Sequence, residues 1–493
     1  MLLTLLALVA AGALVRGDGQ PGAQNRGGDV PQARNVVVVM TDDMRFDDLA
    51  GMPFTKRMFA EQGASFTSAY DDFPLCCPSR AAFLTGQYAH NHGVQSNQPD
   101  GVAAFMDREP DDLLPGWLGE QGYATGMVGK YFNHYGERGA GVVPPEWDYW
   151  RALMYPRGNP SYYGYALNED GHPRRYPESP RNYLTSTLTR QAVDFITDRR
   201  EAEDGKFFLW VSYFAPHVGQ GVPYARLPRR DPYNDRHRYC AKGPKPAPGA
   251  LAAHLNDPLP ARGGYDEDTS DKPASIRRQA LERDERTAII ARHRCRRASL
   301  AEADRGVRKI VNALGPELED TLLVFLSDNG YLQGEHRVPL GKLKVYEESA
   351  RVPIMLRGPG VPAGVVDRTV VSNVDVAATI VDATGAEPGR RLDGTSLLKV
   401  LEGTAGPRAG VLIRSARYEA VHTGRWVWAR HEGGPTEREL YDLAADPFQL
   451  NNLWDVRTGQ PRPGYAGRVE ELEALLGRLR DCRGERECSG LAE

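Results

Sequence analysis

The segment from Cys76 to Gly86, CCPSRAAFLTG, decides how the rest of the chain is interpreted. Two cysteines, a proline, a serine and an arginine precede a small and apolar run that predicts a helix, so Cys76 should lie just before this helix or in its first turn. The first turn of a helix carries free N–H groups and the positive end of the helix dipole, which favour an anionic ligand. The alternative is a buried cysteine pair or half of a disulfide.

Two predicted strands end in acidic sequences. The apolar runs at 35–40 and 322–326 are typical of strands buried on both faces of a parallel sheet, and TDD follows the first while SDNG follows the second. Open α/β sheets bind ligands at the carboxyl ends of their strands, so these oxygens predict a site for a hard divalent cation, calcium rather than zinc. Taken alone, the acids could instead cap helices. The predicted ligands are Asp42, Asp43, Asp328 and Asn329.

The length and the charge of the chain bound its class. With 493 residues it is too long for one ordinary core and long enough for one large α/β domain with a smaller appendage. The formal net charge is only −4, so the overall balance gives no reason to expect nucleic acid or an acidic membrane surface as a partner.

The amino-terminal residues are predicted to precede the fold. Residues 1–15 are apolar, uncharged and too short to span a bilayer, which favours a secretory signal peptide. Residues 16–33 are rich in Gly, Gln, Pro and Arg and are expected to form a flexible leader. We therefore expect a secreted or extracytoplasmic protein without stable membrane insertion. Export permits disulfides, with four free thiols in a cytosolic enzyme as the alternative. The candidate pairs are Cys482 with Cys488 and Cys240 with Cys295.

The motif Cys76-x-Pro78-Ser79-Arg80, with Leu84-Thr85-Gly86 behind it, resembles the signature of the type I sulfatases. In that family a formylglycine-generating enzyme oxidises the first cysteine, which implies that Cys76 becomes formylglycine and that Cys77 fills a variable position. The resemblance implies an alkaline-phosphatase-like α/β fold: a large mixed sheet flanked by helices, with a small C-terminal antiparallel sheet plus helix. It also implies one bound Ca²⁺ ion, with Mg²⁺ as an alternative. The implied metal ligands are Asp42, Asp43, Cys76, Asp328 and Asn329.

Further basic residues match family positions that handle the sulfate group. Lys130 ends a predicted strand and loop at 122–130, His217 follows an apolar strand at 207–213, and Lys342 lies in a segment similar to the late lysine segment of the family. The resemblance implies that Arg80 steadies the hydrated formylglycine, that Lys130 holds sulfate, and that His217 or Lys342 protonates the leaving alcohol. For any single lysine or histidine, a surface location is the alternative.

The sequence after Lys130 departs from the common pattern. Many arylsulfatases have Trp-His at this point, whereas this chain has Tyr-Phe-Asn-His at 131–134. This variant, the double cysteine and the segment His90-Asn91-His92 resemble the N-acetylglucosamine-6-sulfatase branch. The candidates for the role of the missing histidine are Asn133, His134, His90 and His92.

The chain is predicted to divide into three parts. These are a signal peptide and leader at 1–33, a catalytic α/β domain at 34–404 and a small C-terminal α+β subdomain at 405–493. Within the second part, residues 219–286 are rich in Pro, Arg, Asp and Gly and are expected to form a long surface excursion.

The leading functional hypothesis is hydrolysis of sulfate esters through a formylglycine gem-diol, on sulfated sugars such as N-acetylglucosamine 6-sulfate or on aryl sulfates. The runner-up is a phosphate or phosphonate ester hydrolase of the same superfamily. One predicted metal site argues against it, because phosphatases of this superfamily more often hold two zinc ions. The third hypothesis is a non-catalytic binding protein, in which Cys76 is never converted.

Overall fold

The computed structural model describes residues 32–106, 112–137, 139, 141–155, 160–202, 205–219, 240, 243–260 and 263–492. The signal peptide and almost all of the leader predicted for residues 1–33 lie outside these ranges, as does part of the excursion predicted at 219–286. Within the described residues, no helix is both long and apolar enough to cross a membrane.

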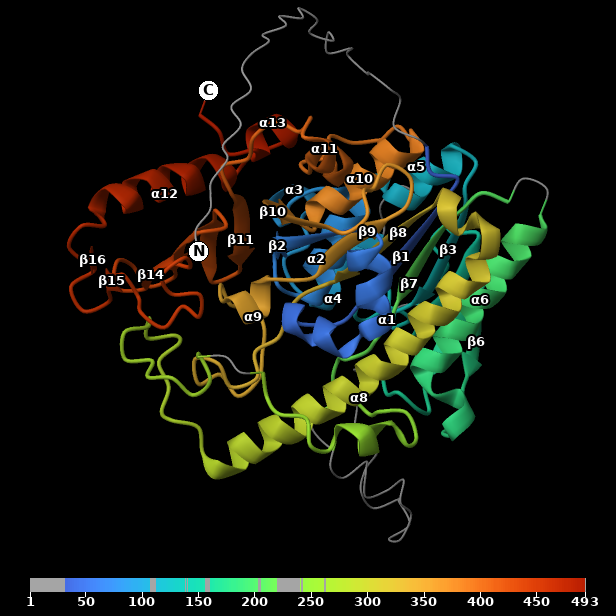
Figure 1. Ribbon diagram of the computed structural model, residues 1–493, viewed down its shortest axis with the longest axis horizontal. Coiled ribbons are helices and arrows are strands. Elements are labelled where there is room, and N and C mark those ends of the chain that lie inside the picture. The colour runs from blue at the N-terminus through green and yellow to red at the C-terminus, as the bar shows by residue number, and fades with distance from the viewer. Residues whose placement is uncertain are drawn as a thin grey trace, which may run out of the picture.

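A mixed sheet of ten strands forms the centre of the protein (Figure 1). The strands follow the order β10-β2-β9-β8-β1-β7-β3-β4-β5-β6, and β8, β1, β7 and β3 run parallel to one another. The carboxyl ends of these four strands therefore meet at one edge of the sheet. The strands are β1 (Asn35–Thr41), β2 (Ala64–Tyr70), β3 (Ala124–Gly129), β4 (Tyr149–Leu153), β5 (Ala166–Glu169), β6 (His172–Arg175), β7 (Phe207–Ser212), β8 (Thr321–Ser327), β9 (Ile354–Arg357) and β10 (Val365–Ser372).

Helices cover both faces of this sheet. Helices α2 (Cys76–Thr85), α5 (Leu114–Glu120) and α10 (Val374–Thr384) pack on one face, and α6 (Leu184–Glu201) and α8 (Arg283–Leu314) pack on the other. Strand β1 shows why: alternate valines of its run point to the two cores, and none is more than 1% exposed. A strand covered on both faces needs an unbroken apolar run, which is the pattern of its sequence. The shorter helices are α1 (Pro53–Thr55), α3 (Ala89–His92), α4 (Pro99–Met106), α9 (Glu347–Ala350), α11 (Leu397–Glu402) and α13 (Glu485–Cys488).

A second sheet of four antiparallel strands lies beside the large one. Its strands are β11 (Val411–Ser415), β12 (Tyr418–His422), β13 (Trp426–His431) and β14 (Arg438–Asp442), and a two-stranded ribbon of β15 (Trp454–Asp455) and β16 (Gln460–Pro461) follows. Helix α12 (Ala466–Leu479) packs one side, formed by Leu472, Leu475, Leu476 and Leu479, against one face of this sheet. The predicted fold class is confirmed. Strand β12 was not predicted, and the predicted boundary at 404/405 stays a prediction.

Both candidate disulfides are present. Cys240 is bonded to Cys295 and Cys482 to Cys488, so the alternative of four free thiols is wrong. Cys76 and Cys77 are free and buried.

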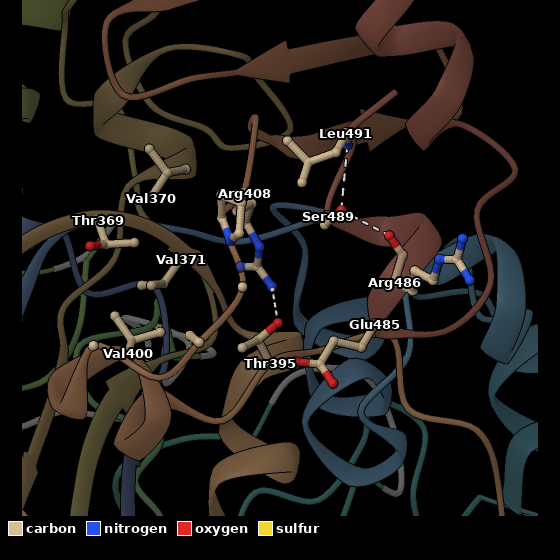
Figure 2. Close-up of a pocket in the computed structure, with 14 residues that line it drawn as sticks. Thr369, Val370, Val371, Thr395, Val400, Arg408, Glu485, Arg486, Ser489 and Leu491 are labelled. Atoms are coloured by element: carbon tan, nitrogen blue, oxygen red, sulfur yellow. Dashed lines mark hydrogen bonds between the residues drawn. The ribbon is translucent and has the colours of Figure 1, made fainter. Parts of the chain in front are cut away.

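A buried ion pair joins the large sheet layer to the segment that leads into the second sheet. Arg408 donates to both carboxylate oxygens of Asp375 at 2.6 and 2.7 Å. It also donates to Thr395, beside a cavity of ≈ 490 Å³ (Figure 2). The Asp375 side chain is fully buried and that of Arg408 is 8% exposed. Replacing Arg408 by glutamine is expected to lower the free energy of unfolding by about 3 kcal/mol, because a buried carboxylate is left without its partner.

The matched control for this prediction is Arg425→Gln. Arg425 makes the same two-pronged contact with Asp442, at 2.9 and 2.8 Å, but its side chain is 60% exposed. Exposed pairs contribute little, so this variant should unfold at nearly the wild-type urea concentration. Equal losses of stability in the two variants would contradict the assignment of Arg408 as a buried structural link.

Candidate active site

The candidate residues meet at the carboxyl edge of the parallel strands. Asp42 and Asp43 directly follow β1, Lys130 directly follows β3, and Asp328 directly follows β8. His217 lies five residues after the end of β7. Because β3, β7, β1 and β8 are neighbours in that order, four chain segments far apart in the sequence deliver their side chains to one place.

Cys76 lies at the centre of this cluster. Helix α2 begins at this residue, as predicted, and the thiol is fully buried. Its sulfur lies 3.6 Å from Asp42 Oδ1 and 2.7 Å from Lys342 Nζ. Burial raises the pKa of the Cys76 thiol to about 11, although the charges of Lys130 and Lys342 act in the opposite direction. An unmodified Cys76 is therefore protonated at neutral pH and is a poor nucleophile.

Arg80, one helical turn after Cys76, connects three strand ends. Its Nε and Nη2 donate to Asp328 Oδ2 at 3.0 and 2.8 Å, and its Nη1 donates to the Lys130 carbonyl and to Ser212 Oγ, each at 2.6 Å. Burial and the negative charge of Asp42 raise the pKa of Asp328, while Arg80 opposes this shift. Arg80 thus fixes the relative positions of the ends of β8, β3 and β7.

Two lysines place ammonium groups on the carboxylates. Lys130 Nζ lies 2.5 Å from Asp42 Oδ2, and Lys342 Nζ contacts Asp43 Oδ1. Burial acts to raise the pKa of Asp42, but the charges of Lys130, His217, Arg80 and Lys342 outweigh it and hold that pKa well below its usual value. Lys342 is 14% exposed at its side chain and His217 is 11% exposed, whereas Lys130 is fully buried. The site therefore opens to solvent beside Lys342 and His217.

Four side chains could hold a metal ion together. Asp42, Asp43, Cys76 and His217 each offer a ligand atom, and these atoms all lie within 4.8 Å of one another. Asp43 has a left-handed backbone (φ 65°), which short acidic residues tolerate at a sharp turn.

The residues present fit a cation. Lys342 Nζ contacts Asp43 Oδ1, lies 3.3 Å from Asn329 Oδ1 and touches the Cys76 sulfur, so an ammonium group marks the point where three of the predicted ligands converge. Asp328 supports them, because its Oδ1 accepts from the Asp43 N–H at 3.0 Å. Carboxylate and amide oxygens suit a hard ion such as calcium.

The His217 ring is held by the backbone carbonyl of the next residue. Its Nδ1 lies 2.8 Å from the Val218 carbonyl oxygen, which can only accept, so Nδ1 carries the proton and Nε2 faces Asp43 Oδ2 at 3.7 Å. Burial lowers the pKa of His217, although Asp42 and Asp43 act to raise it. The unprotonated Nε2 of a histidine held this way can bind a metal ion, or it can take up a proton and then donate it.

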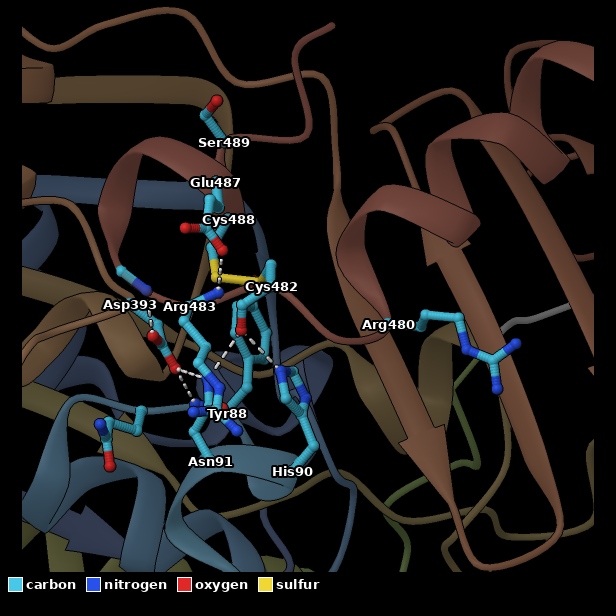
Figure 3. The surroundings of a disulfide bond; sticks show 12 residues. Tyr88, His90, Asn91, Asp393, Arg480, Cys482, Arg483, Glu487, Cys488 and Ser489 are labelled. Atoms are coloured by element: carbon cyan, nitrogen blue, oxygen red, sulfur yellow. Dashed lines mark hydrogen bonds between the residues drawn. A yellow bond between two sulfur atoms is a disulfide. The ribbon is translucent and has the colours of Figure 1, made fainter. Parts of the chain in front are cut away.

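The four candidates for the missing histidine occupy different places. The His90 ring lies 2.9 Å from the Cys482 carbonyl, which also accepts from Asn91 at 2.8 Å (Figure 3). His134 Nδ1 lies 3.0 Å from Glu137, and His92 Nδ1 accepts from the Val94 N–H. The structure therefore assigns other contacts to these three histidines.

Asn133 is the fourth candidate, and its backbone N–H points to the Cys77 sulfur at 3.4 Å. It therefore lies next to the double cysteine.

Two residues that contribute to the geometry of the site, Arg296 and Ser212, were not predicted. Arg296, in the middle of α8, donates to the Asp43 carbonyl at 2.6 Å and to Asp48 at 2.5 Å, and so holds the turn after β1. Ser212, the last residue of β7, accepts from Arg80. The only sequence signal for Ser212 is its place at a strand end, and Arg296 has no signal among the many arginines of that helix.

Comparison with known proteins agrees with this geometry. A family model described as Sulfatase matches residues 34–386. The chain belongs to the sulfatase family. This sulfatase is accordingly a sulfuric ester hydrolase, and a second model, described as N-sulphoglucosamine sulphohydrolase, C-terminal, matches its residues 334–462.

Relatives of this sulfatase include enzymes of animals and bacteria. It is 32% identical over 475 residues to the N-acetylglucosamine-6-sulfatase of Homo sapiens, covering 85% of this chain and 80% of that protein. It is 29% identical over 384 residues to the extracellular sulfatase SULF-1 homolog of Drosophila melanogaster, covering 74% of this chain and 31% of that much longer protein.

A solved structure, BT4656 in complex with D-glucosamine-2-N,6-O-disulfate, superposes on this sulfatase with a TM-score of 0.71 at 23% identity. The superposition covers 90% of this chain and 97% of that one. The alkaline-phosphatase-like fold is therefore confirmed.

Proposed function

We propose that this sulfatase removes sulfate from sulfated sugars, with a 6-O-sulfated N-acetylglucosamine as its first substrate, after conversion of Cys76 to formylglycine. The observation that carries the proposal is the environment of Cys76: a buried residue at a helix start, in contact with Asp42 and Lys342. A thiol with a pKa of about 11 is poorly suited to attack sulfur directly, which supports a role as the precursor of a better nucleophile.

The proposed chemistry at residue 76 has two steps. One hydroxyl of the hydrated aldehyde gives up its proton as its oxygen attacks sulfur, the bond from sulfur to the ester oxygen breaks, and the leaving alcohol takes a proton. The second hydroxyl then loses its proton, the bond from carbon to the sulfate oxygen breaks, and the aldehyde returns as sulfate leaves. An ordinary serine or cysteine cannot perform the second step, because it has no second hydroxyl.

The basic residues have separate proposed roles in these steps. Lys130 holds the sulfate oxygens, and Arg80 steadies the hydrate and the neighbouring carboxylates. His217 or Lys342 protonates the leaving alcohol, since both stand at the open side of the cluster where the alcohol must depart.

A bound calcium ion, with magnesium as an alternative, would orient the sulfate oxygens and the nucleophile. The residues proposed to hold it are Asp42, Asp43, residue 76, Asp328 and Asn329. Three buried carboxylates already face three cations at this site, the buried Arg80 and Lys130 and the partly exposed Lys342. A divalent ion would leave the site with excess positive charge, which is what an anionic sulfate ester needs.

The maturation and location of the protein follow from the same proposal. A formylglycine-generating enzyme must act on Cys76, and an amino-terminal signal peptide would export the chain. Two disulfides support an oxidising, extracytoplasmic environment.

The substrate is tested with a panel of 4-nitrophenyl sulfate and monosaccharides sulfated at the 6-, 4- and 2-positions. We expect kcat/KM for N-acetylglucosamine 6-sulfate to exceed that for the other sugars at least about tenfold, because a site built to hydrogen-bond particular hydroxyls rejects their rearrangement. A phosphate monoester and a phosphonate monoester belong in the same assay. If another sugar sulfate were preferred, the substrate assignment would fail while the sulfatase assignment stood.

A further inference from the structure

One tyrosine beside the active-site cluster has a buried hydroxyl without a partner. Tyr155 lies two residues after the end of β4 and is only 2% exposed. Its hydroxyl oxygen is buried and makes no hydrogen bond to a described residue. A buried polar group without a partner costs free energy, so its retention calls for a purpose other than stability.

The topology of the large sheet places Tyr155 next to Lys130. Strand β4 runs parallel to β3, and Ala152 of β4 is paired with Gly129, the residue before Lys130. Tyr155 therefore follows the carboxyl end of β4 at the same edge of the sheet at which Lys130 follows β3. The Tyr155 N–H donates to the Tyr135 carbonyl at 2.8 Å, which ties the chain after β4 to the loop after Lys130.

Four members of the active-site cluster act on the Tyr155 hydroxyl. Burial raises the pKa of the Tyr155 phenol, and Lys130 opposes this shift. Asp42 and Cys76 raise that pKa further, while Arg80 lowers it. In turn, burial lowers the pKa of Lys130, and Asp42, Cys76 and Tyr155 raise it. The hydroxyl therefore faces the cluster and is protonated at neutral pH, ready to donate a hydrogen bond.

Two neighbouring tyrosines bury their hydroxyls with partners from the protein. The Tyr162 hydroxyl donates to the His217 carbonyl at 2.8 Å. The Tyr135 hydroxyl accepts from Trp150 Nε1 at 2.6 Å and from Asn168 Nδ2 at 2.7 Å. These two hydroxyls have structural roles, whereas the partner of the Tyr155 hydroxyl is to be sought in what the cluster binds.

We propose that the Tyr155 hydroxyl donates a hydrogen bond to an oxygen of the bound sulfate group, beside Lys130. This inference rests on the proposed function and adds to it a further catalytic residue, for which the sequence gives no signal. A hydrogen bond to an anionic oxygen is stronger than one to a neutral acceptor. A phenol supplies this bond without adding a charge to a buried site that already holds several.

The test replaces Tyr155 by phenylalanine, which removes one oxygen atom and keeps the ring in the core. The matched control is Tyr88→Phe. The Tyr88 hydroxyl is also buried and makes no hydrogen bond to a described residue. The charges that act on it, first among them those of Arg408 and Asp375, lie outside the active-site cluster. Tyr88 itself lies beside the Cys482–Cys488 disulfide (Figure 3).

Sulfate binding is measured by calorimetry, with sodium sulfate added to the purified protein in a buffer that contains calcium. We expect the Kd for sulfate to rise about tenfold in Tyr155→Phe and to stay at the wild-type value in Tyr88→Phe, because only the first variant loses a hydrogen bond to a charged group. An unchanged Kd in Tyr155→Phe, as for a hydroxyl that only bonds a buried water, would overturn the inference. An equal change in the control would overturn it as well.

Thermal unfolding separates this role from a structural one. Each variant loses a buried hydroxyl that has no partner in the protein, so the Tm of both should equal or exceed that of the wild type. A hydroxyl that served only packing would behave in the opposite way. A lower Tm with an unchanged Kd for sulfate in Tyr155→Phe would therefore also overturn the inference.

Turnover separates this inference from the proposed function. For 4-nitrophenyl sulfate, kcat/KM should fall at least about tenfold in Tyr155→Phe and stay within about twofold of the wild type in Tyr88→Phe. If the wild type hydrolysed no sulfate ester, the proposed function would fail, and the Kd for sulfate would still decide the role of Tyr155. A wild type that bound no sulfate would overturn the inference.

Discussion

Cys76→Ser is expected to fold normally and to lose turnover of 4-nitrophenyl sulfate by at least about 1000-fold, the scale seen when a nucleophile is removed. The change is small and the site is buried, so packing is nearly conserved, but a serine at position 76 cannot form the gem-diol. At most the variant traps a stable sulfate ester at position 76. The measurements are kcat and the mass of the protein after exposure to substrate.

The matched control is Cys77→Ala, which should keep substantial turnover. Cys77 is equally buried, but its sulfur contacts the Asn133 N–H rather than the carboxylates. In wild-type protein from the native host, the peptide containing residue 76 should be about 18 Da lighter than its unmodified form, by the atoms exchanged. An unmodified peptide would favour the hypothesis of a non-catalytic binding protein. If Cys77 were essential and Cys76 dispensable, the alignment of the motif with this sequence would be wrong by one residue.

Removal of the metal is expected to have an effect of similar size. Dialysis against a chelator should abolish activity, and calcium or magnesium should restore it while zinc should not, because the proposed ligands are mainly oxygens. Asp328→Asn should reduce the bound metal from about one ion per chain to nearly none and lower kcat at least about 100-fold. Elemental analysis of the purified variant measures the number of metal ions bound per chain independently of activity.

A surface variant controls for the loss of one carboxylate. Asp268→Asn removes a side chain that is 74% exposed, and it should bind metal and turn over substrate as the wild type does. Full activity in metal-free Asp328→Asn protein would end the case for a catalytic metal ion.

The sequence predicted the central architecture because the signals for it are local. The run of valines in β1 and the apolar run in β8 require burial on both faces, as in a parallel sheet. Parallel strands have their carboxyl ends at the same edge of the sheet, which brings Asp42 and Asp328 together. Cys76 at the start of α2 follows equally from the pattern around it. Lysines 130 and 342 were identified through the family resemblance, because no local sequence pattern separates a single buried lysine from a surface lysine.

Other parts of the site could not be predicted from local patterns. Arg296 reaches the turn after β1 from a helix about 250 residues later, and only the packing of that helix on the sheet makes the contact. The contact of His90, one of the four candidates for the missing histidine, is of the same kind, because its partner, the Cys482 carbonyl, lies 392 residues further along the chain. Contacts of this range depend on tertiary structure and leave no periodic signal.

The complete burial of Cys76 determines when this residue can be modified relative to folding. Because the residue has no exposed surface and its sulfur contacts Asp42 and Lys342, the folded protein gives the active site of a second enzyme no access to that sulfur. Any maturation of this residue must therefore occur while the segment from Cys76 to Gly86 is still extended, during synthesis or transport. A cell that folds the chain faster than it modifies it would accumulate correctly shaped molecules that no later encounter can activate.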